Sequence, residues 1–365
     1  MKKTKIKHIS GISLLFISVF ISGCTHVPNE TIKNNSFSGE IINMENQPVI
    51  QSPVLKGYHI RFREGYIKPA GRIFVKGDTC IVENAVTQNE PYFLAYSLSE
   101  KKRIGKFGII GNGPNEMLYP DFSGFRNCPG FIGEVYDSGI CRHFLIDKDF
   151  NIHLDSIWTN IGETMKLVSS GNMSYMAKNE TNGNSLYCYH AGDTTKTRIY
   201  NLALDPQVHV WSAYIGSLEI NPVRKILVYA YQYFRQIHIF NLETNTCTII
   251  KYPDQHKKHN DIKDWLDITS VSYYLDVSLG EQYIYCLYSG KTPKEVIEDD
   301  KKDNKFCFSI EQYDYDGNYI RTIQINKRTR YLSVDESRNK LYVLSVFDDE
   351  PLYVYDLPPV NTHRK

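Results

Sequence analysis

The chain has 365 residues, of which 13% are aromatic, and its 42 basic and 41 acidic side chains give a formal net charge of +1. This balance does not favour nucleic-acid binding, which needs a clear excess of basic residues. The 27 tyrosines and 17 phenylalanines stand beside abundant isoleucine and valine, and these residue types favour β-strands. We therefore expect an all-β protein, and the length allows one large repeat fold or two ordinary domains.

Residues 1–23 have the layout of a secretion signal. Four lysines precede an apolar run over residues 9–21, which is shorter than the roughly 20 residues that cross a bilayer as a helix. The run ends in the sequence Ile-Ser-Gly-Cys at Cys24, and this junction resembles the lipobox of bacterial lipoproteins. The resemblance implies cleavage before Cys24 and attachment to a membrane through lipid on that cysteine. The alternative is an ordinary signal peptide followed by an incidental cysteine.

Removal of residues 1–23 takes away four lysines and no acids, so the mature charge is 38 minus 41, or −3. In lipoproteins that this junction resembles, an aspartate after the cysteine favours retention in the inner membrane. Thr25 occupies that position, so the resemblance implies an outer-membrane lipoprotein of the cell envelope. Residues 24–53 are polar and predict a lipidated tether. The leaflet that the protein faces and its oligomeric state stay open.

A recurring unit of short strands rich in aromatic and β-branched residues covers most of the mature chain. Its six copies fall at spacings of roughly 45 to 60 residues, which is the size of a four-stranded propeller blade. The strands of the copies lie within residues 72–107, 122–154, 165–202, 213–250, 272–323 and 330–355. We therefore predict a six-bladed β-propeller of antiparallel blades over residues 54–360, followed by a short tail over residues 361–365.

The sixth unit has three strands instead of four, because Leu357-Pro358-Pro359 cannot continue a ladder that needs backbone donors. Residues 38–44 and residues 58–62 are both available to supply the missing strand. We expect one of these segments to pair with residues 352–355 and close the ring.

The pattern Gly-Asn-Gly-Pro-Asn-Glu from Gly111 to Glu116 follows the first unit. It resembles the G-x-G-P-x-E sequence that follows the first blade in six-bladed, TolB-like β-propeller lipoproteins of Bacteroidetes. This resemblance extends over nearly the whole mature chain and implies the fold and the location. The family has no single activity, so no catalytic residue is carried over. We interpret the motif as a connection between blades in which the glycines adopt positive φ, with Asn112 and Glu116 facing the surface of the ring.

Tyr229, Tyr231 and Tyr233 alternate along one predicted strand and lie beside Arg235. Tyrosine and arginine form rigid contact surfaces in sugar and peptide sites, so these four residues join Asn112 and Glu116 as the candidate binding surface. Alternation places the three tyrosines on one strand face, where packing between blades is the other interpretation.

The sequence predicts neither a metal site nor a cofactor. Seven cysteines remain beside Cys24, and no C-x-x-C pair occurs, which argues against zinc and thioredoxin-type sites. A bridge between Cys128 and Cys141 stays open, because geometry decides it. Residues 314–318 lack the acid that a calcium loop requires and predict a hairpin turn. Residues 291–304 have mixed charge and no apolar periodicity, so we expect an exposed loop.

Two functions fit this sequence. The first is a binding or scaffold propeller that meets a glycan, a peptide or a partner protein. The alternative is a calcium-assisted hydrolase, lyase or lactonase acting at the mouth of the propeller channel. Three or more converging Asp, Glu, Asn or His side chains with shifted pKa values would favour the enzyme. An apolar or aromatic mouth would favour binding.

Overall fold

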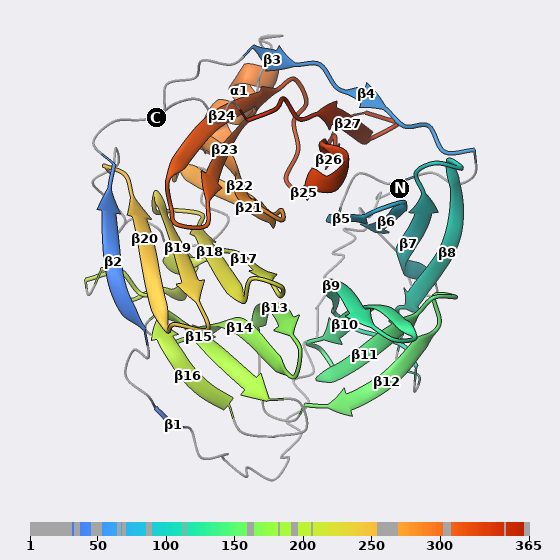
Figure 1. The fold of residues 1–365 in the computed structure, drawn as a ribbon, viewed down its shortest axis with the longest axis horizontal. Helices are drawn as coiled ribbons and strands as arrows, with labels where there is room; N and C mark the ends of the chain where they lie inside the picture. Colours follow the sequence, from blue (N-terminus) through green and yellow to red (C-terminus); the bar gives the residue numbers. More distant parts are fainter. Residues whose placement is uncertain are drawn as a thin grey trace, which may run out of the picture.

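The computed structural model describes residues 31–32, 37–44, 53–63, 67, 71–84, 90–111, 113, 115–158, 164–181, 183–190, 196–205, 207–253, 269–301, 308–346 and 348–360. Six β-sheets stand around a common axis, and the first strand of each sheet lies nearest that axis (Figure 1). Successive strands of a sheet pair antiparallel from the axis outward. The predicted six-bladed β-propeller is confirmed.

The first three blades follow one another in chain order. Blade 1 contains β5 (Ile73–Lys76), β6 (Thr79–Glu83), β7 (Pro91–Ser97) and β8 (Lys102–Ile109). Blade 2 contains β9 (Pro120–Cys128), β10 (Phe131–Asp137), β11 (Arg142–Asp147) and β12 (Ile152–Ile157). Blade 3 contains β13 (Thr164–Ser170), β14 (Met173–Glu180), β15 (Gly183–His190) and β16 (Lys196–Asn201).

The last three blades continue the ring. Blade 4 contains β17 (Gly216–Asn221), β18 (Ile226–Tyr231), β19 (Gln236–Asn241) and β20 (Thr246–Lys251). Blade 5 contains β21 (Ser272–Leu279), β22 (Tyr283–Lys291), β23 (Phe308–Asp314) and β24 (Tyr319–Ile325). Blade 6 contains β25 (Leu332–Asp335), β26 (Lys340–Leu344) and β27 (Leu352–Asp356).

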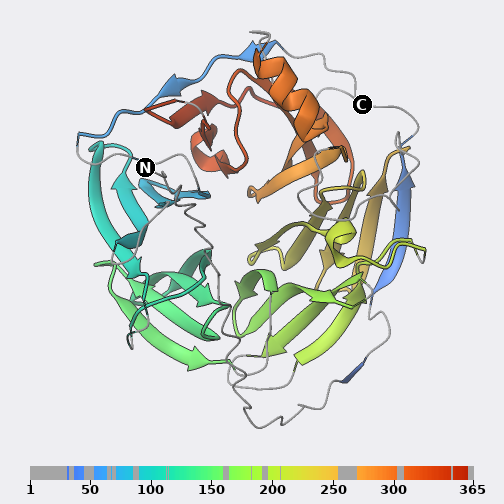
Figure 2. The ribbon, with the colours of Figure 1, turned by 180° about the vertical axis from the view of Figure 1, so that it is seen from behind.

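The N-terminal segment runs along the outside of four consecutive blades (Figures 1 and 2). We call its four strands the belt: β1 (Thr31–Ile32), β2 (Ser38–Asn43), β3 (Val54–Leu55) and β4 (Tyr58–His59). The first three pair parallel with β16, β20 and β24 and add a fifth strand to blades 3, 4 and 5. The fourth pairs antiparallel with β27 and completes blade 6.

The predicted ring closure is therefore confirmed, and residues 58–59 supply the closing strand. Residues 38–43 pair with β20 instead. This part of the predicted tether belongs to the folded ring, because its backbone continues the hydrogen-bonded ladder of blade 4.

Two local expectations are wrong. Residues 211–214 form a turn of 3-10 helix, and the first strand of blade 4 begins at Gly216 instead of residue 213. The Tyr214 hydroxyl donates to the carbonyls of Asp205 and Val208, at 2.7 and 2.8 Å, and this holds the turn in place.

The second wrong expectation is the exposed loop after β22. Helix α1 (Pro293–Lys301) occupies most of it. The Glu295 backbone N–H donates to Thr292 Oγ1 at 3.1 Å, and the Glu295 carboxylate accepts from the Thr292 N–H at 2.8 Å. This reciprocal pair is the capping box that begins many helices. The Thr-Pro-Lys-Glu sequence from Thr292 to Glu295 is a capping-box pattern that predicts a helix. Our expectation rested on the mixed charge of the segment and did not use this pattern.

Candidate functional site

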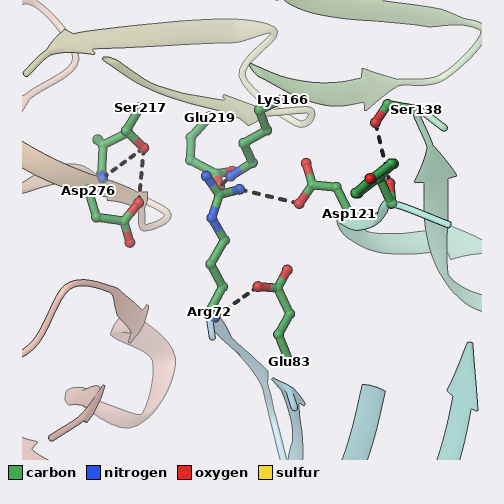
Figure 3. Close-up of polar contacts among 10 residues, drawn as sticks. Arg72, Glu83, Asp121, Ser138, Lys166, Ser217, Glu219 and Asp276 are labelled. Carbon is green, nitrogen blue, oxygen red and sulfur yellow. Dashed lines mark hydrogen bonds and ion pairs between the residues drawn. The ribbon is translucent and has the colours of Figure 1, made fainter. Parts of the chain in front are cut away.

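Charged side chains from the innermost strands of five blades meet around the axis of the ring. Arg72 lies just before β5, Asp121 lies in β9, Lys166 in β13, Glu219 in β17 and Asp276 in β21. Figure 3 shows Arg72, Asp121, Lys166 and Glu219 pointing toward one another across the axis. We call the five charged residues, together with Glu83, the axial cluster.

Two ion pairs in the axial cluster join neighbouring blades. Arg72 Nη1 lies 3.3 Å from Asp121 Oδ1 and links blades 1 and 2. Lys166 Nζ contacts Glu219 Oε1 and links blades 3 and 4. The Lys166 side chain is only 3% exposed, whereas those of Arg72, Asp121 and Glu219 are 20 to 24% exposed. Solvent therefore reaches the cluster from within the ring.

Hydrogen bonds continue this linkage around the ring. Ser217 Oγ in blade 4 donates to Asp276 Oδ1 in blade 5 at 2.9 Å. The other oxygen of Asp276 accepts the Leu332 N–H of blade 6 at 3.0 Å. Ser333 Oγ then accepts the Val75 N–H of blade 1 at 2.9 Å. Because each of these groups is buried, a lost partner would leave a polar atom without compensation.

Glu83 adds a fourth carboxyl group at the end of β6, and it is 8% exposed. Its Oε2 accepts the Arg72 N–H at 3.0 Å, and its other oxygen has no partner among the described residues. Burial, reinforced by the nearby Asp121 carboxyl, raises the pKa of Glu83 to about 7, although Arg72 opposes the rise. At neutral pH this carboxyl can therefore both accept and donate a proton.

The pKa values of two other acids in the cluster are shifted in the same direction. Burial raises the pKa of Asp121 and of Asp276, although Arg72 and Lys166 oppose the rise in both. Burial by itself would lower the pKa of Arg72, but Asp121, Glu83 and Asp276 raise it above its ordinary value. Asp121 Oδ2 is buried and has no hydrogen-bond partner among the residues that the structure describes. Arg72 therefore stays charged, whereas burial disfavours the ionised forms of Asp121 and Asp276.

The acids converge, as the sequence-based criterion for an enzyme requires, but cations and backbone donors face them. In the part of the chain that the structure describes, no group of three or more His, Cys, Asp or Glu side chains could hold a metal ion. The carboxylates of the cluster already accept from Arg72, Lys166 or a backbone N–H group, so a metal ion would have to compete with these partners.

A comparison with protein families identifies the chain's relatives. The model of the TolB-like 6-blade propeller-like family matches residues 47–337. The chain belongs to this family. None of the curated proteins matches it.

Two solved structures share the fold of this TolB-like propeller. One is a member of the DUF4221 family from Bacteroides vulgatus ATCC 8482, with a TM-score of 0.57 and 12% identity, over 85% of this chain and 97% of the other. The second is a Bacteroides fragilis NCTC 9343 protein predicted to be exported, with a TM-score of 0.56 and 12% identity, over 87% and 99%. At this identity the likeness shows the fold alone.

The tyrosines of the candidate binding surface are core residues of this TolB-like propeller. Tyr229 and Tyr231 have no exposed surface, and Tyr233 is 2% exposed. The Tyr229 hydroxyl donates to the Tyr214 carbonyl at 2.6 Å, and the Tyr231 hydroxyl donates to the Leu202 carbonyl at 2.9 Å. The interpretation as an exposed surface is therefore wrong for these residues, and packing between blades 3 and 4 explains their alternation.

Arg235 is also buried, with 2% of its surface exposed. Its Nη2 lies 2.6 Å from Glu311 Oε1, and its guanidinium lies between the rings of Tyr252 and Tyr288, at 4.3 and 4.0 Å from their centroids. These contacts join blades 4 and 5. A cavity of about 380 Å³ lies beside Arg235 and is lined by Leu204, Asp205, Phe234, Arg235, Gln236, Lys251 and Tyr252.

Glu116 is half-buried and holds the connection between blades 1 and 2. Its Oε2 accepts the Gly113 N–H at 2.6 Å. A Cβ at Gly111 would lie 2.1 Å from that same oxygen, so the glycine is needed for close approach. Neither Gly111 nor Gly113 adopts the positive φ that we expected.

The remaining predicted sites fall partly outside the described residues. Cys24, the lipidation site, and Asn112, a candidate binding residue, both lie there. Cys141 is a free thiol, and the side chain of Cys128 is outside the described part of the chain.

Sequence reasoning missed the axial cluster, because each of its members is a single polar residue in a different strand. The signal that could have found them is positional. In five of the six repeats, a charged residue of the axial cluster stands in the first strand or just before it.

Proposed function

We propose that this TolB-like propeller is a lipid-anchored protein of the cell envelope that binds a ligand at its axial cluster and releases it unchanged. The observation that carries the proposal is the pairing of the axial acids. Asp121, Glu219 and Asp276 already accept from a cation, a serine or a backbone N–H. Such fixed, partly solvent-exposed charges form a preorganised recognition surface.

The location is supported by the sequence around Cys24 and by the predicted export of the Bacteroides fragilis relative. No helix among the described residues is long and apolar enough to cross a membrane. Lipid on Cys24 would supply the attachment, and the missing aspartate after it favours the outer membrane.

Replacing Cys24 with alanine tests this attachment. We expect Cys24→Ala to move the protein from the membrane fraction to the soluble fraction, because no acyl chain can then be added. The measurement is fractionation with immunoblotting, and unchanged thermal unfolding of the purified variant serves as the control. Retention of the variant in the outer-membrane fraction would contradict the proposal.

Binding without turnover is tested with panels of short peptides and oligosaccharides. We expect isothermal titration calorimetry to find a saturable ligand whose affinity falls at least tenfold in Asp121→Asn. Mass spectrometry of that ligand after prolonged incubation should return it intact. A product formed by the wild-type protein and not by Asp121→Asn would show that the protein is a catalyst and would contradict the binding proposal.

A calcium-assisted hydrolase, lyase or lactonase is the second candidate. The converging acids and the pKa of Glu83 near 7 favour it, because a group with that pKa can act as a general acid or base. Calorimetric titration with Ca²⁺ separates the two candidates. The enzyme predicts saturable Ca²⁺ binding that Asp276→Asn weakens, whereas the binding proposal predicts no heat above dilution.

A further inference from the structure

We propose that the axial cluster binds an organic cation, namely the ammonium or guanidinium group of a ligand that reaches the axis of the ring. This inference rests on the proposed binding function and adds the chemical class of the ligand.

The first argument is the charge of the axial cluster. Its six members comprise the cations Arg72 and Lys166 and the carboxyl groups of Glu83, Asp121, Glu219 and Asp276. With every group ionised, the cluster would carry a net charge of −2. Like charges in a buried site destabilise one another unless an opposite charge enters or a proton is taken up. A cationic ligand would supply the missing charge.

The second argument is that two acceptors in the cluster are free. Asp121 Oδ2 is buried without a partner in the described part of the chain. Glu83 is more than nine-tenths buried, and its Oε1 has no partner among the described residues. Figure 3 shows both carboxyl groups turned toward the Arg72 side chain inside the ring. A buried, unpaired acceptor such as Asp121 Oδ2 costs free energy until a donor reaches it, and an ammonium group has three donors.

The third argument is that two tyrosine rings lie beside these acceptors. Tyr92 lies in β7, next to the residue that pairs with Glu83, and Tyr331 precedes β25. Both rings are partly buried, and the Arg72 guanidinium already lies 5.5 Å from the centroid of the Tyr331 ring. Aromatic faces attract organic cations, whereas they add nothing to a strongly hydrated metal ion. The surroundings thus favour an organic cation over Ca²⁺.

Binding should be linked to proton release. The groups that face Glu83 are Arg72, Asp121 and Lys166 from three neighbouring inner strands, with the hydroxyls of Tyr92 and Tyr331 nearby. A bound cation favours the ionised carboxylate, so it lowers the pKa of Glu83 from about 7. Affinity should therefore rise about tenfold between pH 6 and pH 8 and level off above that range.

The experiment uses the mature protein with its signal removed and two matched probes. One is the peptide acetyl-Gly-Gly-Lys-Gly-Gly-amide, and the other is the same peptide with the lysine acetylated on Nζ. We expect calorimetry to show saturable binding of the first peptide and at least tenfold weaker binding of the second. Cadaverine, a free diamine, shows whether the cationic group alone is sufficient or a peptide backbone is required.

Variants locate the site. Glu83→Gln and Asp121→Asn should each weaken binding of the lysine peptide at least tenfold, and Glu83→Gln should also flatten the pH profile. Glu243 lies in the exposed turn between β19 and β20, away from the innermost strands. Glu243→Gln should therefore bind the lysine peptide as the wild type does. The pH profile of the unaltered protein keeps the test decisive even where a variant fails to fold.

Equal binding of the two peptides, or an affinity that falls as the pH rises, would overturn the cation proposal. Saturable, Asp121-dependent binding of a neutral or acidic ligand would also overturn it, yet it would leave the proposed binding function standing. Conversion of a ligand to a product would overturn the binding function itself. The two failures are therefore distinguishable.

Discussion

The inner and outer edges of the ring are held together in different ways. At the outer edge, backbone pairing attaches the belt to blades 3 to 6. At the inner edge, single side chains such as Asp276 and Ser333 bridge neighbouring blades. Backbone pairing tolerates most side-chain changes, whereas an inner contact depends on one residue. Substitutions should therefore be costly at the axis and mild along the belt, unless the belt backbone itself is removed.

Removing the closing strand should have the largest effect. A mature variant that starts at Arg63 lacks all four strands of the belt and also Ile60 and Phe62, which pack on the core beside Tyr96. We expect a loss of at least about 4 kcal/mol in the free energy of unfolding, because apolar contacts and a strand ladder disappear together. Urea unfolding measures it.

A variant that starts at Lys56 is the matched control for this truncation. It keeps β4 but lacks β1, β2 and β3, which add fifth strands to blades that already have four, so its loss should be smaller. Equal losses in the two variants would contradict the special role of β4.

The next largest effect should come from the axis. Asp276→Ala leaves the Ser217 hydroxyl and the Leu332 N–H without their acceptor, so we expect a loss of about 3 kcal/mol in urea unfolding. Asp276→Asn retains one acceptor oxygen and should cost less. A variant with wild-type stability would show that the inner edge does not hold the blades together.

A change of pH should act on the axis through Glu83. The folded-state pKa of Glu83, about 7, exceeds its ordinary value of 4.5. The native state therefore binds more protons than the unfolded state between these values, and stability falls as the pH rises. We expect ionisation of Glu83 to lower the free energy of unfolding by about 2 kcal/mol between pH 5 and pH 8. Urea unfolding at each pH measures this loss, and Glu83→Gln should make it smaller.

The smallest effect should come from an ion pair of the belt. Glu350 contacts His59 and Arg61, but these two side chains are 52% and 80% exposed. Solvent screens such pairs, so Glu350→Ala should change the free energy of unfolding by less than about 1 kcal/mol. A loss as large as that of Asp276→Ala would remove the contrast between the two edges.

The fold was predictable because its signals are local and repeated. Each blade carries the same succession of short aromatic strands and turns, and six repeats determine the ring. The Leu-Pro-Pro sequence at residue 357 even indicated that a strand was missing. The parallel belt strands were not predictable, since β2 and β20 lie about 200 residues apart and an edge strand has no sequence signal for its partner.

The candidate site was predicted less well. Tyr229, Tyr231 and Arg235 have residue types that suit a binding surface, but the same types fill a core when their polar ends find partners. Burial decides between these roles, and it depends on the neighbouring blade. Arg72, Asp121 and Lys166 were overlooked because nothing near them in sequence indicates that they meet.

The sequence by itself determined the strand-forming segments, the number of blades and the place of the lipobox-like junction at Cys24, because each depends on residues close together in the chain. Only the tertiary structure decided which strand closes the ring, which tyrosines are buried and which charges share the axis. Those properties arise when segments tens to hundreds of residues apart come into contact, where burial and the nearest opposite charge set the pKa of each group.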